Sequence, residues 1–584
     1  MREPTMKWFF EPRRDNNGAE RDQARHDHDD STPGLINLPV AVLQRHGARV
    51  LDPGTAVAVR GYPTPRSTVY RARTLLVPGD LLADRGFIAA VNRVLERAGM
   101  NLVPVESYRD TSDRRGDGLR RLPRPAVLVP AEGNILPVEV DAWRALQTLR
   151  AAATVREQSE LDETAVRRIA LEHLLIGTTL TGSPIGGWAG GIPGNPGTSN
   201  DSTDSYLFSG GDARTPVAVL MDAPKRKPAS ECSSEYGRRP VLAVLDTGLR
   251  VHPWLDVTVK PGAGYETVAD GFAAVDDNIQ QAIRVAGELA ATSGDWPHEV
   301  IKHPWDTPVT ADRLVGELDD AIGHGTFIAG IVRQVAPDAQ VLAVRVMHSD
   351  DVAYEGDILC ALGQLAQRIA DAEIGDLAAM VDVVSLSFGY FSESPSDMAF
   401  SFALWQAIEI LIGLGVVVVA AAGNYSTSSL FYPAAFAEQP VPAGQVPVIS
   451  VGALNPNGSK AVFSNGGRWI TAWATGAAVV STFPTDINAS RSPELRMRAQ
   501  AADQLPPGAS LPAEREALDP DDYSDGFAIW SGTSFSAPLV AAHVIGSLLA
   551  GAAGTVPGLR LDLPGQAAAM DRAVAAMKNL GWPG

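Results

Sequence analysis

Residues 531–538 read Ser-Gly-Thr-Ser-Phe-Ser-Ala-Pro and lead directly into an apolar run over residues 539–550. This pattern predicts a buried helix that begins close to Ser534, because Gly532 allows a close backbone approach and Pro538 is best tolerated in a first helical turn. Ser534 would then lie at the positive end of a helix, where its own amide faces an oxygen that becomes negative during acyl transfer. The plain alternative is a capping sequence, so a catalytic interpretation requires a base and an orienting carboxylate elsewhere.

Two further segments supply those groups. His324 lies in residues 323–332, Gly-His-Gly-Thr-Phe-Ile-Ala-Gly-Ile-Val, whose apolar positions predict a helix with the histidine at its exposed start. Asp246 ends the apolar run of residues 241–246, which predicts a strand buried on both faces of a parallel sheet, and such sheets carry their chemistry at the carboxyl ends of strands. Each residue alone has a structural explanation as a polar residue or a turn. Together the three predict a nucleophile with its base and orienting acid.

These segments resemble the subtilisin-like serine peptidases, the subtilase family, in which the chain order is Asp, His, Ser. The resemblance extends from about residue 238 to about residue 552. It rests also on the segments 249–255, Ser385-Leu386-Ser387-Phe388-Gly389, Ala420-Ala421-Ala422-Gly423-Asn424, Tyr432-Pro433-Ala434 and 448–453. It implies that Asp246, His324 and Ser534 form a catalytic triad.

The resemblance also implies how a substrate is held. Asn424 would donate its side-chain amide to the oxyanion beside the Ser534 amide, and Ser387, Phe388 and Gly389 would pair with an extended substrate as an added strand. The specificity pocket would lie between that strand and the second wall, with Phe431 at its base. The residues of the second wall are Ala421, Ala422 and Gly423. Since an aromatic ring consumes depth and no acid lies in these segments, we predict cleavage after small or medium apolar residues.

A loop of some relatives is missing from this sequence. In calcium-binding subtilases the helix that carries the catalytic histidine is interrupted by a loop that wraps the ion, whereas here Val332 is followed directly by residues 333–337, Arg-Gln-Val-Ala-Pro. We therefore predict no metal site and no cofactor.

Composition bounds the partners and the compartment. The net charge of −19 argues against nucleic acid or an anionic membrane as the main partner. The resemblance to subtilases implies that the partners are protein or peptide substrates. Cys232 and Cys360 are too few for a disulfide framework and are expected to be free thiols. No secretory signal and no run of about 18 uninterrupted apolar residues is seen, so the expected location is cytoplasmic.

The chain of 584 residues is too long for one ordinary domain. The expected fold class is α/β, a subtilisin-like, mainly parallel sheet with helices on both faces, preceded by a small α+β N-terminal module. The boundaries expected are a disordered arm over 1–36, the module over 37–155, a helix and Gly/Pro-rich linker over 156–237, and the peptidase domain over 238–584 with insertions at 264–322 and 485–524. Surface decoration is the default expectation for both insertions, and a lid is the alternative.

The N-terminal region is open to more than one interpretation. The module over 37–155 is either propeptide-like, covering the cleft until it is removed, or a lasting regulatory domain that binds a protein partner. Residues 157–175 are expected to form a charged helix, and residues 177–216 are either a processing site or a plain connection.

Three other functions compete with an active peptidase. An aspartic peptidase built on Asp246-Thr247-Gly248 would require a second such motif, and none occurs. A catalytically silent scaffold would normally have lost a triad residue. A peptidase held latent by its N-terminal module differs only in regulation.

Overall fold

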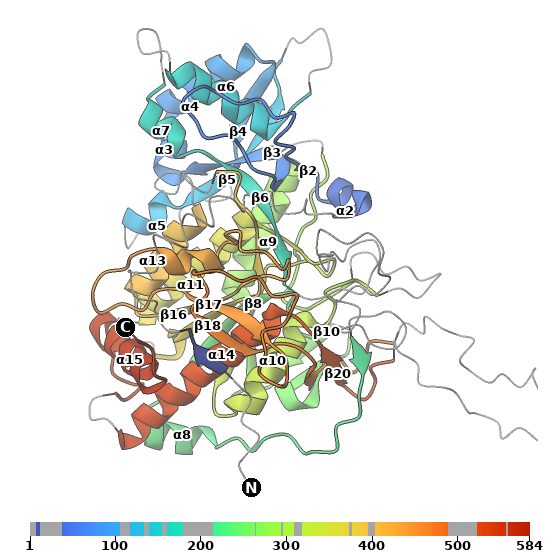
Figure 1. Ribbon diagram of the computed structural model, residues 1–584, viewed down its shortest axis with the longest axis vertical. Helices are drawn as coiled ribbons and strands as arrows, with labels where there is room; N and C mark the ends of the chain where they lie inside the picture. The colour runs from blue at the N-terminus through green and yellow to red at the C-terminus, as the bar shows by residue number, and fades with distance from the viewer. Residues whose placement is uncertain are drawn as a thin grey trace, which may run out of the picture.

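The computed structural model describes residues 8–11, 38–105, 117–132, 139–154, 161–178, 214–262, 264–293, 296–308, 318–372, 377–394, 403–488, 522–555 and 559–583. The N-terminal module stands at one end of an elongated molecule, and the larger α/β domain forms the rest (Figure 1). A long strand, β6 (Ala170–Gly177), runs from the module into the α/β domain.

An eight-stranded sheet forms the centre of the large domain, in the order β1-β18-β17-β16-β14-β8-β12-β11. All its pairings are parallel except that of β1 with β18. Its strands are β1 (Trp8–Phe10), β8 (Val241–Asp246), β11 (Ala273–Val275), β12 (Gln340–Arg345), β14 (Val383–Leu386), β16 (Val417–Ala421), β17 (Ile449–Leu454) and β18 (Ala472–Thr475). The parallel arrangement agrees with the expected fold class.

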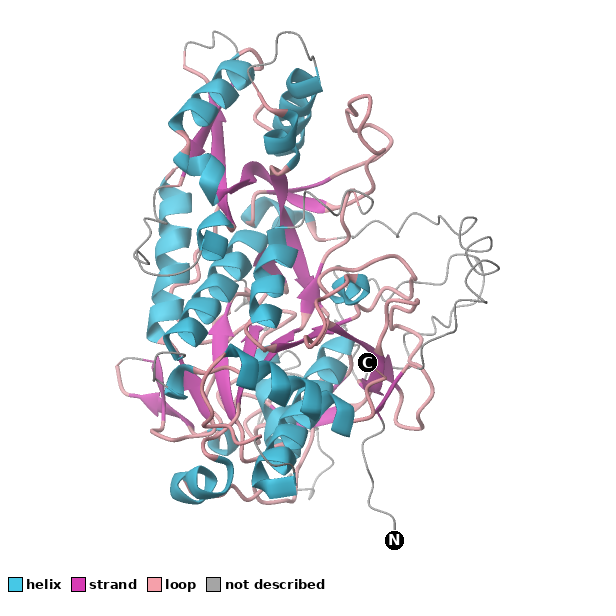
Figure 2. Cartoon of the chain, turned by 90° about the vertical axis from the view of Figure 1, so that its left-hand side faces the viewer, coloured by secondary structure: helices cyan, strands magenta, loops and turns pink. Residues whose placement is uncertain are grey.

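Helices cover both faces of this sheet, because its strands are apolar on both sides. Along β8, Ala243 and Leu245 join the core under α9 (Asp277–Thr292), α11 (Glu355–Ala372) and α13 (Ala403–Gly413). Leu242 and Val244 join the core under α10 (His324–Val335) and α14 (Thr533–Ala550). Figure 2 shows the helices stacked against the strands along the length of the molecule.

The module is built on a second, antiparallel sheet in the order β13-β6-β3-β5-β4. The module contributes the strands β3 (Val69–Pro78), β4 (Met100–Pro104) and β5 (Pro123–Pro130), and its helices α4 (Arg85–Glu96) and α6 (Ala142–Thr154) share one apolar core with them. The short strands β13 (Val352–Tyr354) and β15 (Phe388–Gly389) belong to the large domain and pair with β6. One sheet therefore crosses from the module into the large α/β domain.

Smaller elements complete the described fold. They are α2 (Val40–Arg45), β2 (Ala48–Val50), α3 (Gly79–Ala83), α5 (Asp117–Arg121), α7 (Glu163–Arg167), β7 (Thr215–Pro216), α8 (Ala229–Tyr236), η4 (Pro253–Leu255), β9 (Val257–Lys260), β10 (Gly264–Thr267), η5 (Leu377–Ala379), η6 (Ala434–Glu438), β19 (Val479–Thr482), β20 (Phe527–Trp530), η9 (Gly551–Thr555) and α15 (Gln566–Asn579).

Three expectations about the N-terminal and inserted segments are wrong. The predicted helix over 157–175 is the five-residue α7 followed by β6, whose charged residues are paired in the interior rather than exposed. Residues 8–10, expected in a disordered arm, form the edge strand β1, while residues 12–37 lie outside the described part. The insertion at 264–322 is not surface decoration where it is described, because β11 extends the central sheet and α9 packs on it.

Helix α14 is both long and apolar. The span Thr533–Gly554 has a mean hydropathy of 1.6, enough by length and composition to cross a membrane, but 78% of that window is buried inside the protein. The high hydropathy of α14 is therefore explained by its place in the core. This helix also carries Ser534.

Candidate active site

Asp246 and His324 meet at the carboxyl end of β8. Asp246 Oδ1 lies 2.7 Å from His324 Nδ1, and both side chains are buried. The contact depends on two glycines, since a Cβ on Gly325 would lie 2.2 Å from the Gly248 carbonyl oxygen and Gly248 has a φ of +94°. The start of α10 can thus press against the end of β8. The histidine predicted at an exposed helix start is completely buried, because Trp530 and Phe535 pack around its ring.

Asp306 is a site residue that the sequence did not reveal. Its Oδ2 accepts hydrogen bonds from Thr247 Oγ1 at 3.0 Å and from the Gly323 amide at 2.7 Å, so it links the ends of β8 and α10. Burial raises the pKa of Asp306 to about 6 against the opposing effect of Arg345. It lies inside the insertion over 264–322, and no local motif distinguishes it there.

Ser534 lies in the first turn of α14, as predicted, but Pro538 does not. The helix begins at Thr533, so Pro538 falls in the second turn, where its missing N–H leaves the Ser534 carbonyl without its helical donor. Ser387 Oγ donates to that carbonyl at 3.2 Å instead. Ser387, which is predicted to bind substrate, therefore also completes the hydrogen bonds of the helix that carries Ser534.

Asn424 is held with its amide nitrogen turned into the cleft. Its Oδ1 accepts hydrogen bonds from the Thr533 amide and hydroxyl, both at 2.9 Å. Its Nδ2 donates to the Thr178 carbonyl at 2.6 Å. The orientation is fixed, so this nitrogen is a ready donor to an oxygen in the cleft.

The Thr178 carbonyl oxygen is the point on which the site converges. Besides Asn424 Nδ2, it accepts hydrogen bonds from the Ser534 amide at 3.1 Å and from Ser534 Oγ at 2.8 Å. Two of these donors, Asn424 Nδ2 and the Ser534 amide, would still face the oxygen if Ser534 Oγ became bonded to the carbonyl carbon, which is the arrangement that stabilises a tetrahedral oxyanion. Since Ser534 Oγ points to Thr178, His324 Nε2 has no hydrogen-bond partner within the described ranges.

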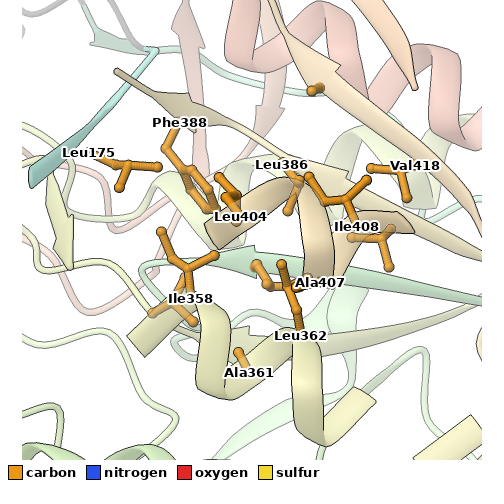
Figure 3. Packing of buried hydrophobic residues seen from close by; sticks show 14 of the residues in the cluster. Leu175, Ile358, Ala361, Leu362, Leu386, Phe388, Leu404, Ala407, Ile408 and Val418 are labelled. Carbon is orange, nitrogen blue, oxygen red and sulfur yellow. The ribbon is translucent and has the colours of Figure 1, made fainter. Parts of the chain in front are cut away.

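The residues before Thr178 lie along the cleft as an extended strand. Gly177 pairs with Phe388 and Ile176 with Gly389, and the Thr178 amide donates to the Ser387 carbonyl at 3.0 Å. On its other edge β6 pairs with β13. Leu175 packs in one cluster with Phe388 and Ile358 (Figure 3). The segment Ser387–Gly389, which is predicted to pair with a substrate, thus pairs with a strand of its own chain.

Phe431 lies where the specificity pocket is expected. Its buried ring packs against Gly389 and Gly423, whose added Cβ atoms would lie 2.3 and 3.0 Å from it. Ala421 and Ala422 are buried at the end of β16. Phe431 therefore fills the space between the two walls.

Comparison with known proteins identifies the family. The sequence model of the subtilase family, Peptidase S8, matches residues 237–552. Subtilisin BL of Lederbergia lenta is 30% identical over 45% of this chain and 73% of its own length, and M-protease of Shouchella clausii (strain KSM-K16) is 28% identical over 50% and 60%. A crystal structure of a lanthipeptide protease is 18% identical over 53% of this chain and 72% of that chain, with a TM-score of 0.30, which is too low to carry an argument.

The fold is that of a subtilisin-like α/β domain. Because the family model covers more than half of the chain, the protein belongs to the subtilase family of serine peptidases, and the resemblance seen in the sequence is confirmed.

Proposed function

We propose that this protein is a serine endopeptidase that is made latent by its own N-terminal module and cuts its chain after Thr178. The observation that carries the proposal is the Thr178 carbonyl, which accepts hydrogen bonds from Asn424 Nδ2, the Ser534 amide and Ser534 Oγ. A peptide bond in this position faces both the nucleophile and the donors that would stabilise its oxyanion.

The reaction follows from these positions. Ser534 Oγ turns from the Thr178 oxygen towards His324 Nε2, which takes its proton as Oγ attacks the Thr178 carbonyl carbon. The oxyanion keeps the donors from Asn424 and the Ser534 amide. His324 then gives the proton to the amine of Thr179 as the peptide bond breaks, and water hydrolyses the acyl-enzyme. Asp246 holds the imidazole tautomer and stabilises its charged form.

Latency follows from the same strand. While β6 lies between β13 and β15, no substrate strand can pair with Ser387–Gly389. Charged contacts hold the module in place outside the cleft: Asp350 Oδ2 binds Arg45 at 2.6 Å and His46 at 2.9 Å. Arg71, fully buried, stacks over the ring of Tyr354 at 4.0 Å. The module is thus an inhibitor that exposes the cleft only when it is displaced.

The test compares the full chain with its Ser534→Ala variant. After incubation we expect the wild type to yield a new N-terminus at Thr179, identified by mass spectrometry, and to react with a fluorophosphonate. The variant should do neither while keeping its melting temperature. Ser536→Ala is the matched control, because that hydroxyl, two residues along the same helix, donates only to the Thr533 carbonyl at 2.8 Å. Cleavage after Thr178 by Ser534→Ala would overturn the proposal.

A further inference from the structure

His173, five residues before Thr178 in the bound strand, is enclosed by charged and aromatic groups. Its Nδ1 lies 2.7 Å from Glu355 Oε2 and its Nε2 lies 2.8 Å from Glu393 Oε2. The ring stacks on Tyr390, with centroids 4.2 Å apart and planes 24° apart. The His173 amide also donates to Glu355 Oε2, at 3.1 Å. One carboxylate therefore binds both the backbone and the side chain at this position.

The three groups around the ring belong to the peptidase domain, not to the module. Glu355 opens α11, and Tyr390 and Glu393 follow β15, the strand beside which a substrate would lie. The N-terminal segment contributes His173 and also covers the two carboxylates. Tyr70 pairs with His173, and the Arg66 amide donates to the Glu393 carbonyl at 2.8 Å. When the module leaves, the two carboxylates and the ring of Tyr390 stay in the cleft.

A cation suits this position for a physical reason. Two buried carboxylates without a positive partner are unfavourable, and charged hydrogen bonds are stronger than neutral ones. Burial works against a charge on His173, but Glu355 and Glu393 outweigh it and raise the His173 pKa to about 10. The bound strand therefore presents a positive charge at neutral pH.

We infer that Glu355 and Glu393, with the face of Tyr390, form a subsite that selects a basic side chain at the sixth residue before the scissile bond of a protein substrate. The inference rests on the proposed function, because it assumes that substrates lie in the cleft as β6 does. The register of β6 provides the spacing: Thr178 is the first residue before the cut and His173 the sixth. The preferred substrates are extended segments with Arg, Lys or protonated His at that place.

The test uses quenched fluorescent peptides with the sequence Xaa-Leu-Leu-Ile-Gly-Thr-Thr-Leu, which is that of residues 173–180 with Xaa in place of His173. Xaa is Arg, Lys, Gln or Glu. We compare kcat/KM for the Arg and Gln peptides with one preparation of the processed full chain. Because bound module reduces both rates equally, their ratio does not depend on the fraction of open clefts. We expect a ratio of about 10 to 100, the range of hydrogen bonds to charged groups.

Substitutions of the two carboxylates test whether they cause the preference for Arg over Gln. Glu393→Gln should bring the ratio of kcat/KM for the Arg peptide over the Gln peptide to within about threefold of unity. Glu355→Gln is the second variant, in case one of the two fails to fold. Glu438→Gln is the matched control, since its carboxylate binds Arg468 away from this subsite, and it should keep the wild-type ratio.

The outcomes separate two failures. If the wild type cuts all four peptides at similar rates, or prefers Glu, the subsite is wrong and the peptidase stands. If it cuts none and does not react with a fluorophosphonate, the proposed function itself fails.

A second observation concerns the other end of the N-terminal segment. Strand β1 is the antiparallel edge of the central sheet, with Trp8 paired to Ala474 and Phe10 to Ala472 (dark blue in Figure 1). Trp8 stacks on His543 of α14, with centroids 5.1 Å apart, and Lys460 Nζ lies 3.2 Å from Glu11. Residues 1–178 would thus hold the peptidase at two separate places after a cut at Thr178.

The geometry points to a two-point attachment in which β1 retains the cleaved N-terminal segment, so that processing alone does not release the cleft. This inference also rests on the proposed cut. Binding at a second site raises the effective concentration of the module at the cleft. It should therefore reduce dissociation of the cleaved segment by about 100-fold or more.

Paired substitutions test the attachment. In the processed protein, Trp8→Ala with Phe10→Ala should increase the dissociation of fragment 1–178 at least about tenfold, measured by size exclusion after dilution. Phe9→Ala is the matched control on the same strand, because Phe9 is 41% exposed and faces away from the core. Equal retention in both variants would overturn the attachment. Absence of a new N-terminus at Thr179 would instead point to failure of the proposed cut.

Discussion

His324 in α10 and His173 in β6 are both buried imidazoles that contact carboxylates, but their surroundings differ in one respect. His324 has a carboxylate only at Nδ1, and its Nε2 has no hydrogen-bond partner within the described ranges. His173 has a carboxylate at each nitrogen. An imidazole with one free nitrogen can take and return a proton, whereas an imidazole between two carboxylates keeps its proton as a fixed charge. In the proposed mechanism the first arrangement serves proton transfer and the second serves binding.

Replacing each histidine by Gln tests this difference most directly. His324→Gln should lower the rate of the cut after Thr178 by about 10⁴- to 10⁶-fold, as loss of the base does in a triad that acts as a unit. His173→Gln should change this rate by less than about tenfold, because the ring does not touch the reacting atoms. Time courses of the new N-terminus at Thr179 measure both. Equal losses in the two variants would show that His173 takes part in the chemistry.

Asn424→Ala is expected to have the next largest effect. It removes one of the donors to the Thr178 oxygen, and loss of such a donor typically lowers a rate by about 100- to 1,000-fold. The variant Asn424→Asp, which keeps the acceptor for the Thr533 amide, separates loss of the donor from loss of local structure. If Asn424→Asp cuts at the wild-type rate, this side chain does not bind the oxyanion.

The fixed charge of His173 predicts a dependence of stability on pH. Its pKa is raised to about 10, above the ordinary 6.5, so its contribution is complete below about pH 6.5 and is lost as pH rises through about 10. In the uncut Ser534→Ala protein, this group should lower the free energy of unfolding by about 1.4 kcal/mol per pH unit between those values.

Adding His173→Gln to Ser534→Ala should remove that part of the slope in urea titrations at pH 7, 8 and 9. Burial raises the pKa of Asp357 to about 8, but its effect is common to both proteins and cancels in the difference. His298→Gln is the matched control: burial and then Arg71 lower the pKa of His298 to about 2, so it is neutral throughout this range. Parallel slopes with and without His173 would contradict the fixed charge.

Sequence reasoning found the triad segments because each has a local pattern: an apolar strand ending in Asp246, a Gly-flanked His324 and a helix that begins at Ser534. It missed Asp306, which lies in an insertion and acts through a contact across 59 residues with Thr247. It also mistook β6 for part of a helix, since Glu172 and His173 read as a charged, exposed face. Their partners lie on distant segments, and only the fold brings opposite charges together there.

The smallest effect on cleavage is expected at the specificity pocket, which would hold the side chain directly before the cut. Phe431 lies between Gly389 and Gly423, so Phe431→Gly should open space for a larger side chain just before the cut. The wild type should prefer small or medium apolar residues there, and the variant should raise the ratio of kcat/KM for a Phe over an Ala substrate by about tenfold, the scale of one filled apolar position.

Loss of a buried ring costs about 3–5 kcal/mol of stability, so Phe431→Leu is a milder second variant. Phe436→Leu is the control for lost packing, because Phe436 contacts Tyr432 rather than the two glycines. Profiling all three against a peptide library measures the change. A dominant preference of the wild type for Arg or Lys directly before the cut would contradict this account, since it would require a carboxylate that the walls of this pocket do not supply.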